Sequence, residues 1–154
     1  MGRFNRTQEV AEAVPNNELR FKLGIKPKHK VCLFRSPKYF LHLFLTGDLK
    51  LAIDWIESDS DVILYWLQPN DNVADIMANL EQMIKRNGRI WLIAPQGEIA
   101  KRLGYTASWE DVKSIVLEAT SLVEGKTLCL SDGARGTQFS FKKAVRGVAA
   151  IESD

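Results

Sequence analysis

The sequence predicts an α/β domain, in which a mostly parallel sheet lies between two layers of helices and ends in an antiparallel hairpin. Three observations predict this three-layer fold. Short apolar segments alternate with segments of helical periodicity, which is the order of a doubly wound sheet. The segment 61–67 is nearly continuous in β-branched and aromatic residues, as expected of a strand covered on both faces. The final segments 127–131 and 138–142 instead alternate with period two, as antiparallel strands do.

The first half of the chain begins with a polar, weakly periodic segment, which we interpret as an N-terminal arm over residues 1–25. The first strand is expected at 31–34. Ser36 and Pro37 are suited to the N-cap and first turn of a helix over 38–45, because proline has no N–H group to leave unpaired there. The remaining strands of this half are expected at 51–56 and 61–67.

The second half contains the clearest helix, which begins after Asn70-Asp71 and carries Lys85-Arg86 in its last turn. An acidic residue at the start of this helix and basic residues at its end agree with the helix dipole, and Gly88 just beyond agrees with a glycine C-cap. The elements that follow are a buried strand at 89–95, a loop at 97–105, a helix from the capping box 108–111, and the hairpin with its connection at 132–137. We therefore predict one domain over 26–146 and a tail at 147–154.

The composition excludes several classes of protein. The 154 residues are 45% hydrophobic and 26% charged, which is typical of one soluble globular domain. No apolar run reaches the roughly 18 residues of a membrane span, and residues 1–9 lack the apolar core of a signal peptide, so we predict a cytoplasmic protein. Cys32 and Cys129 each lie in an apolar run, which favours buried thiols over a disulfide.

Charge is distributed unevenly along the chain. Residues 1–50 carry ten Lys/Arg and four Asp/Glu, whereas residues 51–81 carry seven acidic residues and no basic one. A basic leading segment can contact phosphate backbones, but a solvated surface balanced by the acidic stretch is the simpler interpretation. Only Phe4 and Phe21 accompany the basic residues, which disfavours nucleic acid as a partner. The basic residues of this arm are Arg3, Arg6, Arg20, Lys22, Lys26, Lys28 and Lys30.

Polar residues follow the predicted parallel strands at their carboxyl ends, where doubly wound sheets bind their ligands. The candidate ligand-binding residues are Arg35 and Ser36, then Gln68 and Asp71, then Gln96, and Arg135 in the hairpin connection. No glycine loop of the kind that cradles a pyrophosphate follows the first strand, although Arg35 can still pair with a small anion. A plain capped turn is the alternative. No cluster has zinc-ligand or nucleophile spacing, so we predict neither a metal site nor a catalytic residue.

Several segments resemble the second half of a class I S-adenosylmethionine-dependent methyltransferase, namely 61–66, the helix behind it, 87–95 and the final hairpin. Residues 19–143 more closely resemble a family of short, uncharacterised bacterial domains of unknown function, which have a truncated methyltransferase-like, Rossmann-like fold. The segments that carry this closer resemblance are 23–27, 31–34, 61–64, 88–95, the helix from Trp109, and 128–132 through Phe139.

This resemblance implies a methyltransferase-like fold without its cofactor site. Arg35-Ser36-Pro37 stands where the family has its glycine loop, and the stretch before Asp61 is too short for the usual second and third strand–helix units. We therefore hypothesise a non-catalytic binding or scaffolding module that does not use S-adenosylmethionine and that can form a homodimer. The alternatives are a degenerate methyltransferase or small-anion-binding transferase, and a nucleic-acid-associated protein.

Overall fold

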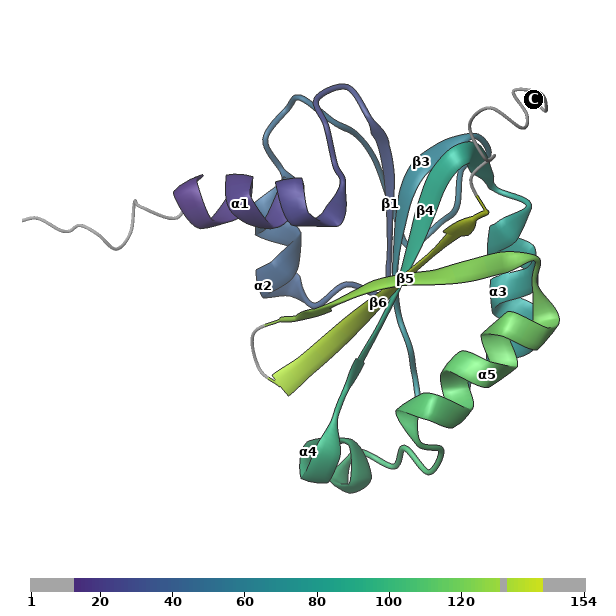
Figure 1. Cartoon of the computed structure of the whole chain (residues 1–154). Coiled ribbons are helices and arrows are strands. Elements are labelled where there is room, and N and C mark those ends of the chain that lie inside the picture. The colour runs from purple at the N-terminus through teal and green to yellow at the C-terminus, as the bar shows by residue number, and fades with distance from the viewer. Residues whose placement is uncertain (1–12, 131–132, 143–154) are drawn as a thin grey trace, which may run out of the picture.

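The computed structural model describes residues 13–130 and 133–142, and six strands within them form one sheet (Figure 1). The strands are β1 (Lys30–Phe34), β2 (Lys50–Ile53), β3 (Ser60–Trp66), β4 (Ile84–Pro95), β5 (Leu122–Cys129) and β6 (Ala134–Phe141). Their order is β2-β1-β3-β4-β6-β5. β1 to β4 pair in parallel, whereas β6 pairs antiparallel with both β4 and β5. The predicted fold class, with its C-terminal antiparallel hairpin, is confirmed.

Helices cover both faces of this sheet (Figure 1). They are α1 (Ala13–Leu23), α2 (Lys38–Leu41) with the 3-10 turn η2 (His42–Phe44), α3 (Val73–Glu81), α4 (Gly97–Arg102) and α5 (Trp109–Ala119). α1 and α2 lie on one face, α3 and α5 on the other. Side chains of β3 serve both layers, since Val62 and Leu64 belong to one apolar core and Ile63 and Tyr65 to the other. This double coverage explains the unbroken apolar run of that strand.

The second half of the predicted N-terminal arm is part of the folded domain. α1 lies inside residues 1–25, and Leu23 and Ile25 are buried in the same core as β1. Arg20 is only 7% exposed, and its Nη2 donates to Asp48 Oδ2 at 2.8 Å. The structure therefore differs here from an arm that ends at residue 25. Residues 1–12 and the predicted tail 147–154 lie outside the described residues.

The connection between β2 and β3 consists of the six residues 54–59, although parallel strands ordinarily need a crossover of about a dozen or more. The segment returns across β1, since the Glu57 N–H lies 3.4 Å from Cys32 Sγ. Asp54 and Asp59 have left-handed φ values of 63° and 58° near its two ends. The turn at Asp54 ends β2 at Ile53, earlier than the predicted strand 51–56. Because β2 is short, the six residues 54–59 are enough to lead the chain back to the start of β3.

The boundary between α3 and β4 differs from the predicted one. α3 ends at Glu81, and residues 85–86 belong to β4 rather than to a last helical turn. Ile84 continues the apolar spacing of the helix, yet it pairs with Ser60 of β3. Gly88 lies in the strand, where a Cβ atom would come 2.9 Å from the Ser60 carbonyl oxygen. The glycine is thus required by close approach of two strands and not by a helix C-cap.

The C-terminal half corrects three smaller predictions. Arg135 belongs to strand β6 rather than to the hairpin connection, and part of the predicted loop 97–105 forms α4. Cys32 is buried as predicted, but Cys129 is exposed at the end of β5. Both cysteines are free thiols. Among the described helices, none is long and apolar enough to cross a membrane.

Candidate functional site

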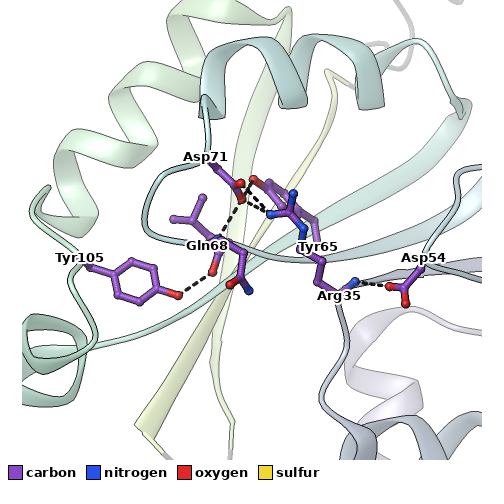
Figure 2. Close-up of polar contacts among 7 residues, drawn as sticks. Arg35, Asp54, Tyr65, Gln68, Asp71 and Tyr105 are labelled. Carbon is purple, nitrogen blue, oxygen red and sulfur yellow. Dashed lines mark hydrogen bonds and ion pairs between the residues drawn. The ribbon is translucent and has the colours of Figure 1, made fainter.

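The strand order reverses at β1, because β2 lies on one side of it and β3 on the other. In sheets of this kind ligands bind beyond the carboxyl ends of the two strands that flank the reversal. Arg35 directly follows β1, and Gln68 and Asp71 follow β3. Three of the predicted site residues are therefore brought together at the reversal point, and their side chains can be followed in Figure 2.

Asp71 is the centre of a polar network at this point (Figure 2). Arg35 Nη1 lies 2.6 Å from both of its carboxylate oxygens. The Tyr65 hydroxyl donates to Oδ2 at 2.6 Å, and the Gln68 N–H donates to the same oxygen at 2.9 Å. The Asp71 side chain is 9% exposed and that of Arg35 36% exposed. The network therefore joins the residue after β1 to the segment after β3 through partly buried polar contacts.

The charge states in the network follow from the same contacts. Burial is the largest influence on the pKa of Asp71 and would raise it, but hydrogen bonds from Arg35, Tyr65 and the Gln68 N–H outweigh burial and lower that pKa below its ordinary value. The hydrogen bond to Asp71 raises the pKa of Arg35. Burial and then the hydrogen bond to Asp71 raise the pKa of Tyr65. At neutral pH the network is a charged pair with a protonated tyrosine.

The backbone of Arg35 is itself held in an uncommon conformation. Its φ is 65°, in the left-handed region that non-glycine residues rarely adopt. Its N–H donates to Asp54 Oδ1 at 2.8 Å, and its guanidinium lies 4.7 Å from the ring centroid of Phe34. These contacts position the guanidinium towards Asp71. The carboxylate of Asp54 thereby connects the end of β2 to the turn after β1.

Ser36 and Pro37 differ from the predicted helix cap. Pro37 is the N-cap of α2, and no side chain caps this helix. The Ser36 hydroxyl donates to the Pro37 carbonyl oxygen at 3.0 Å. The residue predicted as the cap therefore makes a local contact outside the Asp71 network.

A pocket of about 680 Å³ lies one strand further along, between the carboxyl ends of β3 and β4 and the starts of α3 and α5. Its lining is largely apolar and includes the aromatic residues Tyr105 and Trp109. Tyr105 donates from its hydroxyl to the Leu67 carbonyl oxygen at 2.7 Å, and Trp109 Nε1 donates to Thr137 Oγ1 at 3.1 Å. Both aromatic side chains are thus fixed in place. The other polar lining residues are Gln68, Asp71, Asn72, Gln96, Lys101, Thr106 and Ser108.

The two remaining predicted residues, Gln96 and Arg135, lie in different places. Gln96 lines the pocket, and its Nε2 donates to the Ala94 carbonyl oxygen at 3.3 Å. Arg135 is exposed on β6, where it pairs with Ala94, and it does not line the pocket. Sequence reasoning missed Tyr65 and the aromatic pocket wall. No group of three or more potential metal ligands occurs among residues 13–130 and 133–142.

Comparison with known proteins identifies solved structures of similar fold. No protein-family model matches the chain, and no curated protein matches it in sequence. Solved structures do match. The N-methyltransferase NodS from Bradyrhizobium japonicum WM9 has a TM-score of 0.61 and 13% identity, over 89% of this chain and 100% of that one.

Two further structures agree with this match. A SAM-dependent methyltransferase from Aquifex aeolicus has a TM-score of 0.62 and 11% identity, over 86% of this chain and 93% of that one. A TehB-like SAM-dependent methyltransferase from Corynebacterium glutamicum has a TM-score of 0.51 and 12% identity, over 89% of this chain and 90% of that one. The closer resemblance to short bacterial domains stays a prediction. At these identities the likeness shows the fold alone, and that fold is methyltransferase-like and Rossmann-like.

Proposed function

We propose that this protein is a non-catalytic binding module, which keeps a methyltransferase-like fold but whose cofactor crevice is closed by its own side chains. The ion pair between Arg35 and Asp71 carries this proposal. It lies at the reversal point of the sheet, where a ligand of such a fold would be expected. A ligand there would have to displace a carboxylate that already accepts from three residues.

The residues of the turn after β1 do not fit an adenosyl cofactor. A glycine loop binds such a ligand by close approach of the backbone and by converging N–H groups. Here Pro37 has no N–H group, and the Arg35 N–H is taken by Asp54. The direct return of the chain through 54–59 also supports our proposal that the second and third strand–helix units are truncated. A small anion at Arg35 would likewise have to compete with Asp71.

The pocket beside the crevice is the surface we propose for binding. Its volume of about 680 Å³ falls in the range of small-molecule sites, which are mostly apolar with a few polar groups. The fixed rings of Tyr105 and Trp109 suit a flat apolar or aromatic ligand, and Gln68 and Gln96 offer amide groups on either side. Gln68 and Asp71 line this pocket and Arg35 does not, so the pocket is open while the pair between Arg35 and Asp71 is in place.

A degenerate methyltransferase or small-anion-binding transferase is the alternative, and it is compatible with the fold. It requires that S-adenosylmethionine, or an anion, displaces Asp71 from Arg35. Micromolar binding of S-adenosylmethionine would therefore favour this alternative over our proposal.

Filling the pocket tests the proposal. We expect Ala74→Phe, at the pocket wall in α3, to abolish binding of trifluoromethyl-aryl fragments in ligand-observed fluorine NMR, because the new ring takes up pocket volume. The control is Ser114→Phe, which adds a ring to an exposed position of α5 outside the pocket and should leave binding unchanged. Absence of saturable binding to the wild type, or equal binding to both variants, would contradict a binding function for this pocket.

A further inference from the structure

The edge of the sheet where the parallel strands begin, opposite to the pocket, is lined by basic side chains. Lys30 of β1 and Lys50 of β2 are direct partners in the strand register. Arg89 pairs with Ser140 of β6, which brings Lys142 to the same edge. We call these residues the basic edge: Lys26, Lys28, Lys30, Lys50, Lys85, Arg86, Arg89 and Lys142.

Four acidic residues of the described chain lie near the basic edge, and one of them, Asp61, pairs with members of the edge itself. Asp48 pairs with Arg20 at 2.8 Å. Asp61 accepts from the Lys30 N–H at 2.8 Å and lies 3.2 Å from Lys85 Nζ. Glu81 accepts from Ser121, and Asp59 is exposed. The basic residues outnumber these acids, so the edge carries a net positive charge.

Two observations indicate that the clustered positive charge does not stabilise the folded protein. Lys30 and Lys50 are partners in the parallel register of β1 and β2, and like charges on neighbouring strands repel each other. Burial lowers the pKa of His29, Asp61 acts in the opposite direction, and the neighbouring cations Lys26, Lys85 and Arg89 lower it further. The cations are therefore close enough to one another to repel a further proton. Such a concentration of positive charge is stabilised by a polyanion.

The arrangement of the basic edge fits one extended strand of phosphates. Neighbouring strands lie about 4.8 Å apart. The cations of β2 and β1 and, beyond β3 with its Asp61, those of β4 therefore follow one another along the edge of the sheet. The backbone of Phe21, whose side chain is 83% exposed, lies near one end of this row: its carbonyl oxygen accepts from the Gly24 N–H, and a Cβ atom on Gly24 would lie 2.5 Å from Arg89 Nη1. A row of cations beside an exposed aromatic ring is the combination that binds single strands, by phosphate contacts and base stacking.

We propose that the basic edge binds the sugar–phosphate backbone of a single-stranded nucleic acid, with Phe21 as a stacking surface for a base. This surface shares Lys26, Lys28 and Lys30 with the basic N-terminal arm that the sequence indicates, but its other members lie in the strands of the sheet or directly after β6. Arg20 is buried in its pair with Asp48, and Lys22 pairs with Glu18 at 3.4 Å. The surface lies at the end of the sheet opposite to the pocket, so it does not depend on the proposed binding function there.

Fluorescence anisotropy with a labelled oligothymidylate and the full chain tests this proposal. With about four phosphate contacts, we expect the affinity to fall roughly 50-fold when the salt rises from about 50 to about 200 mM. Lys26→Glu combined with Lys50→Glu should weaken binding at least about tenfold, because repulsion replaces two phosphate contacts. Phe21→Ala should weaken it by about tenfold through lost stacking.

The control reverses the same amount of charge at the opposite end of the molecule. Arg102→Glu combined with Arg135→Glu, two exposed residues at the end of α4 and near the start of β6 that do not line the pocket, should change the affinity less than about twofold, since only contacted phosphates contribute strongly. Circular dichroism establishes that each variant is folded. The proposal is overturned if no salt-dependent binding is seen at low salt, or if both double variants lose affinity equally. Tighter binding to a duplex, or to vesicles containing phosphatidylserine, would also overturn it.

Discussion

Replacing Arg35 with methionine is expected to lower the free energy of unfolding by about 2–3 kcal/mol at pH 7, between the values for exposed and buried ion pairs. The variant leaves the carboxylate of Asp71, whose side chain is only 9% exposed, without its charged partner. Tyr65 and the Gln68 N–H still donate to it, which limits the loss. Arg35 is itself 36% exposed, and water screening therefore reduces the effect below that of a fully buried pair.

The pH dependence of this loss identifies its origin. The folded-state pKa of Asp71 lies below its ordinary value, so its stabilising contribution is present above the unfolded-state pKa of about 3.9 and disappears as the pH falls through the folded value. The difference in unfolding free energy between wild type and Arg35→Met should therefore shrink as the pH is lowered below about 4. Urea unfolding at several pH values measures it.

Arg102→Met is the matched control for this experiment, because Arg102 is an exposed arginine at the end of α4. We expect it to change stability by less than about 0.5 kcal/mol. A pH-independent loss in Arg35→Met, or a loss no larger than that of the control, would show that the ion pair with Asp71 does not stabilise the closed crevice.

Trp91→Ala is expected to be the most destabilising single change, at about 3–5 kcal/mol. The indole lies in the middle of β4, is 0% exposed, and donates from Nε1 to the Leu23 carbonyl oxygen at 2.9 Å. Truncation would leave a cavity between the sheet and the end of α1, and an unpaired carbonyl. In a chain of this size such a loss lowers the thermal midpoint by roughly 10 °C, which calorimetry detects.

Two companion variants separate the contributions at this position. Trp91→Phe keeps most of the buried volume but loses the hydrogen bond to Leu23, so it should cost about 1–2 kcal/mol. Trp55→Ala removes an indole that is 56% exposed and should change stability by less than about 0.5 kcal/mol. If Trp55→Ala is as destabilising as Trp91→Ala, the assignment of the core on this face of the sheet is wrong.

The sequence predicts this fold well where local pattern and tertiary environment agree. The unbroken apolar run 61–67 and the alternation of the last two segments both reflect the faces that those strands expose. Prediction fails at Ile84, because its spacing suits a helix while its pairing with Ser60 is made in the tertiary structure. Helix periodicity alone cannot reveal a competing partner that lies 24 residues away in the chain.

The candidate site shows a similar limit. Arg35, Gln68 and Asp71 were predicted separately as strand-end residues, but nothing local indicates that Arg35 donates to Asp71 across 36 positions. Tyr65 was missed because an aromatic residue inside an apolar run looks like part of the core, and its ring is indeed buried there. The sequence suggests that the loop 97–105 covers a cleft, and residues of this segment do line the pocket, but their apolar partners in α3 and α5 come together only in the tertiary structure.

The chain has a methyltransferase-like fold, and we propose that Arg35 and Asp71 close the place where such a fold would hold its cofactor. Isothermal titration of the wild-type protein with S-adenosylmethionine, and with its demethylated product, tests this claim most directly. We expect no saturable heat for either compound at millimolar concentration. Saturable binding in the micromolar range would contradict the claim and would favour a degenerate methyltransferase.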